Sequence, residues 1–402
     1  MLRTTSVRIL LIFKYWKMKR FIFPVCVALM LGSCKKYDVI PDKKNGGDII
    51  SEKSKTGANK DLQTKVIINT LNFPWEILWG PDDFIWFTER EGRVKRINPE
   101  TGQVIDIATI SEVASTTDFN GLLGMALHPQ FETTPHVFLV YNYFDAEGDY
   151  MEKVVRYIYD GTTLISPVTI IDGIVGKIGG DFIHNGSRLL IGPDMKLYVT
   201  TGDANLRFEL PQNTTSLNGK VLRVNLDGTI PADNPFGNAV WSIGHRNAQG
   251  LVFANGKLYS SEHGETTNDE INIIESARNY GWPFVEGFCD LPDEQTFCTA
   301  NNVKEPIITW TPTIAPSGTD FYDHKLIPQW KRSLLVTTLK NRRLMELKLN
   351  NAGTAVNNVH EWFVNEFGRL RDIAISPGGK VYICTDNGNN GDMIIEVTAR
   401  DN

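Results

Sequence analysis

The 402-residue sequence predicts an all-β protein, a single six-bladed β-propeller with four-stranded blades. A short apolar run, a turn, and a second β-branched or aromatic run recur six times after Val66, with the turns 48 to 73 residues apart. Long stretches of helical periodicity, which an α/β fold needs between its strands, are missing. Units of this length match four-stranded sheets stacked around a channel. The turns are anchored at Pro81, Pro129, Pro193, Asn255, Pro328 and Pro377.

The last repeat ends close to the C-terminus, so we expect strands from both ends of the chain to close the ring. We assign the propeller to residues 66–402. The preceding residues 34–65 are rich in Lys, Asp, Gly and Ser and have few large apolar side chains. Such a composition is typical of a flexible tether.

Residues 1–33 have the features of a bacterial lipoprotein signal peptide. From Met18, a second candidate start, basic residues precede an apolar core and the sequence Leu-Gly-Ser-Cys, which predicts Cys34 as the lipidated residue. We therefore expect export to the cell envelope, on the periplasmic side or at the outer membrane, with membrane contact through the lipid only.

The mature protein is expected to be acidic. The signal contains six Lys or Arg and no acidic residue, so its removal changes the formal charge from −6 to −12, that is −6 − 6. An acidic surface repels phosphate backbones and argues against nucleic acid as a partner.

Two cysteines, Cys289 and Cys298, lie nine residues apart in a predicted loop. In an exported protein this pair predicts a small disulfide. A metal site is less favoured because no His and no second Cys pair stands at ligand spacing. Cys384 lies within a strand-like run and is expected to be a buried apolar residue.

Ligands of propellers bind over the central channel, where loops of all blades meet, so a site there combines residues far apart in sequence. Several predicted blade ends carry cations and amides. As a set they predict a cradle for a ligand with several carboxylates or quinone oxygens, whereas each alone fits a solvated charge or an ion pair. They are His245, Arg246, Asn247, Lys340, Arg369 and Arg371.

The stretch from Gly180 to Asp203 predicts a hairpin that displays His184 at one end of a sheet and returns Asp203 to the same end. A neutral histidine can accept a proton near pH 7 when a carboxylate fixes its tautomer. Asp203 is therefore the candidate partner of His184. A hydrogen-bonded loop histidine is the alternative interpretation.

The loop from Ser261 to Asn272 is rich in oxygen ligands. Glu265, Asp269 and Glu270, with carbonyl groups near Gly264, suit calcium, although the spacing is not that of an EF-hand loop. A plain acidic turn explains the pattern equally well.

Several motifs together resemble the soluble pyrroloquinoline quinone (PQQ)-dependent glucose dehydrogenases and the wider glucose/sorbosone (aldose sugar) dehydrogenase family. The resemblance runs from about Val66 to Thr398, with motif order and spacing kept. The motifs include FPWEILWGPDDFIWFTER, NGLLGMALHPQF, HNGSRLLIGPDMKLYVTTGD, GKVLRVNLDGTIPADNPF, IGHRNAQGLVF, DEINIIESARNYGWP, PTIAPSG and GRLRDIAISPGGKVYICTD.

The resemblance implies a six-bladed propeller with PQQ and calcium as cofactors, and roles for matching positions. His184 matches the base for the sugar's anomeric hydroxyl and Asp203 its supporting carboxylate. Arg246 and Asn247 match the pair over the reactive carbonyl and its ring. The cofactor contacts implied are Arg246, Asn247, Thr313, Lys340, Arg369, Arg371 and Thr385. The calcium positions implied are the carbonyls of Gly264 and Glu265 and the acids Asp269 and Glu270.

The sequence departs from the glucose enzymes where substrate is bound. Ile183 replaces an acidic residue before the histidine, and Phe119 replaces a glutamine. Thr311 stands at the place of a tryptophan, which is displaced to Trp310. A shorter loop between Trp282 and Trp310 replaces a dimer-forming insertion.

We expect an oxidoreductase, a quinoprotein that oxidises an aldose at C1 to its lactone and passes electrons to a quinone or other acceptor. Two other functions are compatible with a propeller. One is a calcium-dependent sugar lactonase, against which the cationic residues argue. The other is a non-catalytic propeller that binds a carbohydrate or a protein.

Overall fold

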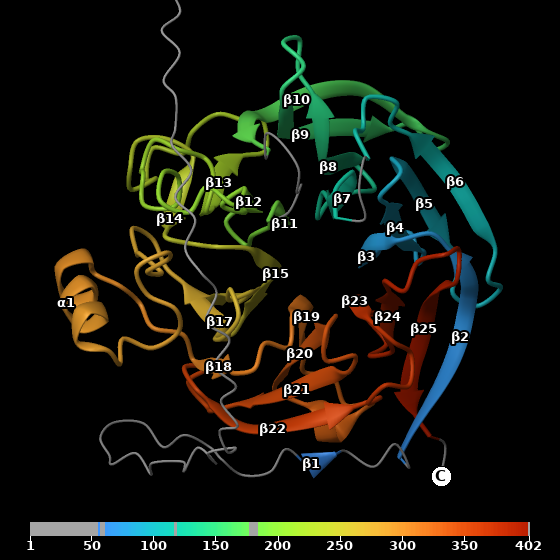
Figure 1. The fold of residues 1–402 in the computed structure, drawn as a ribbon. Coiled ribbons are helices and arrows are strands. Elements are labelled where there is room, and N and C mark those ends of the chain that lie inside the picture. Colours follow the sequence, from blue (N-terminus) through green and yellow to red (C-terminus); the bar gives the residue numbers. More distant parts are fainter. Residues whose placement is uncertain (1–54, 57–60, 116–118, 177–183, 401–402) are drawn as a thin grey trace, which may run out of the picture. The chain divides into compact units, whose positions relative to one another are not determined.

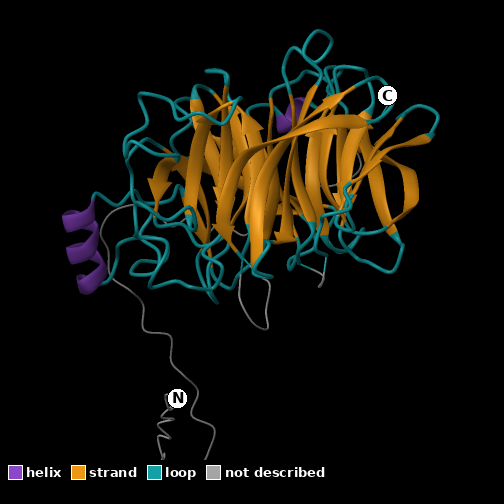
Figure 2. Cartoon of the chain, turned by 90° about the horizontal axis from the view of Figure 1, so that it is seen from above, coloured by secondary structure: helices purple, strands orange, loops and turns teal. Residues whose placement is uncertain are grey.

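The computed structural model describes residues 55–56, 61–115, 119–176 and 184–400. Their strands form six sheets, which Figure 1 shows arranged around a common centre. Seen from the side, the strands run between two faces that carry the loops (Figure 2). The predicted six-bladed β-propeller is thereby confirmed. The signal, Cys34 and most of the tether lie outside the described residues.

Each blade starts at the centre of the ring and adds antiparallel strands outward. Blade 1 consists of β3 (Pro74–Trp79), β4 (Ile85–Glu89), β5 (Arg93–Ile97) and β6 (Val104–Thr109). Blade 2 consists of β7 (Leu122–Leu127), β8 (His136–Phe144), β9 (Tyr150–Tyr159) and β10 (Leu164–Val175). Blade 3 consists of β11 (Gly186–Ile191), β12 (Lys196–Thr201), β13 (Lys220–Asn225) and β14 (Val240–Ile243). Blade 4 consists of β15 (Ala248–Ala254), β16 (Lys257–Glu262), β17 (Asp269–Ile274) and β18 (Ile308–Trp310). Blade 5 consists of β19 (Pro316–Tyr322), β20 (Ser333–Thr338), β21 (Leu344–Leu349) and β22 (Val356–Trp362), and a 3₁₀ helix at Pro328–Trp330 lies between β19 and β20.

Blade 6 contains strands from both ends of the chain. Its inner strands are β23 (Leu370–Ile375), β24 (Val381–Thr385) and β25 (Asp392–Ala399), and its outermost strand is β2 (Leu62–Leu71), antiparallel to β25. The expected closure of the ring is thus present, and β2 begins a few residues before Val66. The short strand β1 (Lys55–Thr56) adds to blade 5 in parallel with β22.

Burial explains why the inner strands lack polar–apolar alternation. β7, with the sequence LLGMAL, is buried over five of its six residues because both of its faces contact neighbouring blades. The outer strand β10 is exposed along much of its length. The apolar core lies between blades, for example where Phe138 of blade 2 and Leu189 of blade 3 belong to one buried cluster.

Glycines allow the inner strands to approach closely at the centre. A Cβ atom at Gly124 would lie 2.1 Å from the carbonyl oxygen of Ser187, and one at Gly318 would lie 1.9 Å from Asp372 Oδ1. Asp372 is itself a central contact, because its Oδ2 accepts hydrogen bonds from the amide of Ile77 (2.8 Å) and from Arg188 (2.9 Å).

The helix α1 (Pro292–Asn301) was not predicted. None of its residues is buried, so the sequence has no apolar stripe by which the helix could be recognised. Cys289 and Cys298, the predicted disulfide pair, are bonded and join the helix to the preceding loop. Cys384 is buried and free. Within the described ranges, no helix has the length and apolarity needed to cross a membrane.

We predict that Gly318→Ala lowers the free energy of unfolding by about 1–3 kcal/mol, because the added methyl group overlaps Asp372. Gly378→Ala is the matched control. It lies in the β23–β24 turn, the nearest atom to its added Cβ is 3.9 Å away, and we expect a change within about 1 kcal/mol. Denaturant unfolding measures both variants. Equal stability of the two would contradict the close packing at the centre.

Candidate active site

His184 and Asp203 form a hydrogen-bonded pair at one end of the β11–β12 hairpin. His184 Nδ1 lies 2.7 Å from Asp203 Oδ1, and Asp203 is 1% exposed. The other carboxylate oxygen accepts a hydrogen bond from Trp282 Nε1 at 2.9 Å. With Nδ1–H donating to the carboxylate, Nε2 is the nitrogen left to accept a proton. The structure brings this predicted pair together.

The backbone at His184 is held in a conformation that depends on Gly202. His184 has φ +64°, and a Cβ atom at Gly202 would lie 1.6 Å from the carbonyl oxygen of His184. The amide of Gly202 also donates to the carbonyl of Asn185 at 2.9 Å. Residue 202 must therefore be glycine for the histidine to occupy this position.

A cavity of about 220 Å³ lies over the inner strands, and His184 is part of its lining. Trp75 of β3 and Leu123 of β7 contribute apolar surface to it. Three arginines also line it, and two of them, Arg369 and Arg371, were predicted. The third, Arg90, was not predicted from the sequence. It directly follows β4 in the sequence Thr-Glu-Arg, and this position at the end of a blade strand could have indicated a residue of the site.

A buried carboxylate, Asp386, contacts all three arginines. Its oxygens lie 2.8 Å from Arg90, 3.3 Å from Arg369 and 2.5 Å from Arg371. Burial opposes ionisation, but the three guanidinium groups hold the pKa of Asp386 below its ordinary value.

Asn247, Gln249 and His263 form a polar part of the same cavity. Asn247 Oδ1 accepts hydrogen bonds from the amide of Gly186 (3.1 Å) and from Gln249 Nε2 (3.0 Å). His263 Nε2 lies 2.8 Å from the carbonyl of Pro316. Burial, with a smaller effect of Arg246, lowers the pKa of His263 to about 3, so this ring is neutral and acts as a hydrogen-bonding group.

Arg246 lines a second, smaller cavity of about 20 Å³ beside the first. Its guanidinium lies 5.2 Å from the ring centroid of Trp282, and Nη1 is 3.4 Å from the carbonyl of His263. Burial lowers the pKa of Arg246 from its ordinary value. His263 lines both cavities, and Trp282, which Arg246 contacts, donates a hydrogen bond to Asp203. Arg246 therefore lies close to the His184–Asp203 pair.

The neighbouring His245, grouped with Arg246 in the sequence, has a structural role instead. It is fully buried, with Nδ1 2.9 Å from Glu262 and Nε2 2.8 Å from Ser242. Its ring stacks on Tyr280 at 4.5 Å. The expectation that it belongs to the cationic cradle is wrong, because both ring nitrogens are bonded within the core.

Lys340, Thr313 and Thr385 do not line the larger cavity. Lys340 is exposed and its Nζ donates to Thr313 Oγ1 at 2.5 Å, while their neighbours Leu339 and Ala315 are part of the lining. Lys340 and Thr313 thus lie at the rim. Thr385 is fully buried and its hydroxyl donates to Asp392 at 2.9 Å, so its side chain serves the sheet.

The calcium candidates separate into two groups. Asp269 holds its own loop: Oδ1 accepts from the amide of Gly264 (2.8 Å) and Oδ2 from the amides of Ile314 and Ala315 (2.6 Å each). Glu265 pairs with Arg207 at 2.6 Å. The carboxylate of Asp269 therefore has a structural role, and that of Glu265 is already paired.

Gly264 and Glu270 line the smaller cavity together with Glu262 and Glu286. Burial and the neighbouring Glu262 raise the pKa of Glu270 well above its ordinary range. In the part of the chain that the structure describes, no three His, Cys, Asp or Glu side chains are grouped so that they could hold a metal ion. A cation here would have to use backbone carbonyls and single carboxylates.

Comparison with known proteins decides the family. The family model described as Glucose / Sorbosone dehydrogenase matches residues 71–395. The chain belongs to the glucose/sorbosone dehydrogenase family. The resemblance inferred from the sequence motifs is confirmed.

Two relatives and one solved structure of this family illustrate the likeness. Quinoprotein glucose dehydrogenase B of Acinetobacter calcoaceticus is 34% identical over an alignment 421 positions long, which covers 83% of this chain and 87% of that protein. Aldose sugar dehydrogenase YliI of Escherichia coli is 27% identical over 350 residues, 83% of this chain and 92% of that protein. The PQQ-bound form of aldose sugar dehydrogenase from Streptomyces coelicolor has a TM-score of 0.72 at 31% identity, over 84% of this chain and 98% of that one.

Proposed function

We propose that this protein is a PQQ-dependent aldose dehydrogenase that oxidises the C1 hydroxyl of a sugar to its lactone and passes the electrons to a quinone or another acceptor. One observation carries the proposal: a carboxylate-supported histidine and a group of arginines line the same 220 Å³ cavity. A proton acceptor beside an anion-binding surface is what oxidation of an alcohol by an anionic cofactor requires.

The residues present fit PQQ, a flat molecule with three carboxylates and two quinone carbonyls. Guanidinium groups bind carboxylates with two parallel hydrogen bonds, and Arg369 and Arg371, which line the cavity, would bind the PQQ carboxylates in this way. Asn247 adds an amide, and Lys340 adds a cation at the rim. When bound, PQQ would supply the acceptor for the hydride that leaves C1.

His184 performs the proton transfer in this proposal. Its Nε2 takes the proton of the C1 hydroxyl, while Asp203 stabilises the resulting imidazolium and keeps the ring in place. Asp203 cannot turn away, because Trp282 and the amide of Asn205 (2.8 Å) hold its two oxygens. Loss of this proton and of the C1 hydride converts the cyclic sugar into the lactone.

The substrate-facing surface differs from that of the glucose enzymes. Phe119 is 55% exposed and lines the cavity. An aromatic ring packs against the C–H face of a sugar, whereas the glutamine it replaces would bond to hydroxyls. Residue 119 therefore influences which aldose fits. Ile183, the other departure, lies outside the described residues.

The alternative functions have less support. A lactonase needs acidic and amide side chains around a metal at the channel, whereas here arginines line the cavity. A non-catalytic binding propeller has no use for the His184–Asp203 pair.

We predict that His184→Gln lowers kcat about 10²–10⁴-fold, because it removes the general base. PQQ binding should persist, since the arginines are unchanged. Apo-protein is loaded with PQQ and calcium, the optical change is titrated, and sugar-dependent dye reduction and lactone formation are measured.

The matched control is His360→Gln on the outer strand β22, which should behave as the wild type. Unchanged kcat in His184→Gln would show that the proposed base is wrong. Absence of any optical change with PQQ in the wild type would favour the lactonase or the binding propeller.

Calcium is proposed to bind at the smaller cavity through the carbonyl oxygens of Gly264 and Glu265 and the carboxylate of Glu270. Oxygen-only donors of this kind suit calcium, which accepts carbonyls, carboxylates and water. The pair Glu262 and Glu270, buried close together, supports the proposal because a bound cation would favour the ionised form of Glu270, which burial and Glu262 disfavour.

We predict that calcium raises the Tm of the protein, because a ligand at 100 times its Kd stabilises the folded state by about 2.7 kcal/mol. Glu270→Gln should reduce this shift, and Glu294→Gln, on the exposed helix α1, should leave it unchanged. Thermal unfolding with calcium and with a chelator provides the comparison. Equal shifts in all three proteins would argue against Glu270 as a ligand.

The protein is further proposed to be an exported lipoprotein of the cell envelope. The signal-like sequence that ends at Cys34 supports this location, and so does the Cys289–Cys298 disulfide, since disulfides persist in oxidising compartments.

We predict that Cys34→Ala moves the expressed protein from the membrane fraction to the soluble fraction and abolishes incorporation of labelled fatty acid. Cys26→Ala, a change inside the signal, should leave both unaffected. Membrane association and labelling of Cys34→Ala would contradict the assignment of the lipidation site.

A further inference from the structure

The three arginines of the larger cavity meet at one carboxylate that lies behind them. Asp386 Oδ1 is 2.8 Å from Arg90 Nη2, and Asp386 Oδ2 is 2.5 Å from Arg371 Nη2 and 3.3 Å from Arg369 Nη2. Asp386, like Arg90 and Arg371, has a side chain no more than 5% exposed. The arginines line the cavity, whereas Asp386 is held beneath them.

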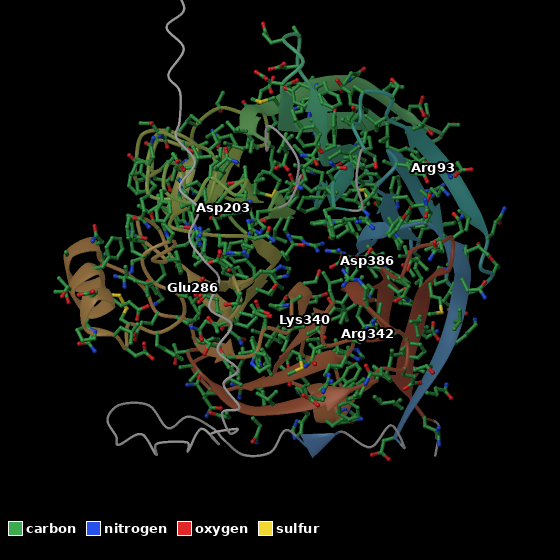
Figure 3. The ribbon with its side chains drawn as sticks, viewed as in Figure 1. Arg93, Asp203, Glu286, Lys340, Arg342 and Asp386 are labelled. Carbon is green, nitrogen blue, oxygen red and sulfur yellow. A yellow bond between two sulfur atoms is a disulfide. The ribbon has the colours of Figure 1, made fainter. Side chains whose placement is uncertain are left out.

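The cluster joins the first and the last blade of the ring. Arg90 follows β4 of blade 1, and Asp386 follows β24 of blade 6. Figure 3 shows Asp386 close to the centre of the ring. The contact between Arg90 and Asp386 therefore forms only when the first and the last blade of the propeller meet, whereas Arg369 and Arg371 belong to the same blade as Asp386.

Arg90 is fixed along its whole length. Its amide donates to the carbonyl of Phe73 at 3.3 Å, and its carbonyl accepts from the amide of Leu122 at 3.0 Å. Its guanidinium lies 3.9 Å from the ring centroid of Phe73. A Cβ atom at Gly121 would lie 2.0 Å from the carbonyl oxygen of Arg90. Such a side chain is preorganised, so it loses little freedom when it binds an anion.

We propose that Arg90 is a third arginine of the cofactor's anion cradle and that Asp386 is the positioning residue that orients all three. The inference rests on the proposed function and extends it by two residues. Three guanidinium charges and one carboxylate leave two positive charges facing the cavity. Asp386 thus lowers the positive charge of the cradle, which weakens its attraction for an anion, but it also fixes the orientation of the guanidinium groups. The affinity gained from this orientation exceeds the affinity lost with the charge.

The test is direct binding of PQQ to the apo-protein in the presence of calcium, measured by calorimetry and by quenching of tryptophan fluorescence. Asp386→Asn and Arg90→Gln should each raise the Kd of PQQ about tenfold or more, since a charged hydrogen bond is lost or misdirected in both. At saturating PQQ, the KM for the sugar should stay that of the wild type.

Arg93→Gln is the matched control. Arg93 lies three residues further along the same hairpin, is 47% exposed and pairs with Glu91 at 3.0 Å. Figure 3 shows it toward the outside of the ring, away from Asp386. Loss of the same charge at this place should leave the Kd of PQQ unchanged.

A lower Tm of apo-Asp386→Asn with an unchanged Kd would overturn the positioning role, because it would mean that Asp386 only joins the blades. Tighter binding by Asp386→Asn would also overturn it.

If that variant does not fold, Arg90→Gln decides, since Asp386 keeps Arg369 and Arg371 as partners. Wild-type protein that fails to bind PQQ would overturn the proposed function as well, whereas equal Kd values in wild type and both variants would overturn this inference alone.

Discussion

The buried guanidinium of Arg188 connects the inner strands of four blades. From β11 of blade 3 it contacts Glu76 of blade 1 (2.6 Å), Asp372 of blade 6 (2.9 Å) and the carbonyl of Gln249 in blade 4 (2.9 Å). Burial, with Asp372 as a further cause, raises the pKa of Glu76 well above its ordinary range. Loss of one partner from a buried ion pair typically costs about 3–5 kcal/mol, so this contact constrains the whole centre of the ring.

The cavity lined by His184 and the arginines, the candidate active site, lies at this centre. Trp75, which lines the cavity, lies 4.4 Å from the guanidinium of Arg188, and Gln249 links Arg188 to Arg371. His184, the proposed proton acceptor, comes from blade 3, and the three arginines come from blades 1 and 6. Neither His184 nor the group of arginines forms the candidate active site without the other. The pairing of β2 with β25 closes blade 6 against blade 1 and thereby brings the two parts to one cavity.

The features that the sequence predicts correctly are those with local signals. Turns recur along the chain and mark the blades, and a hairpin necessarily returns Asp203 to the end where His184 begins. Burial and long-range partners have no local signal. His245 and Asp269 therefore look like site residues until the core contacts of the first and the backbone bonds of the second are seen. Asp386 and Arg90 lie 296 residues apart, and only the closed ring shows that they are paired.

A crystal structure of the protein reconstituted with PQQ and calcium would test most directly whether His184 and the arginines form one site. We expect PQQ in the 220 Å³ cavity, with its carboxylates on the arginines and its reactive edge facing His184. Sugar soaked into such crystals should place its C1 hydroxyl within hydrogen-bond distance of His184 Nε2. PQQ bound elsewhere, or in this cavity but remote from His184, would show that His184 and the arginines do not form the site of sugar oxidation.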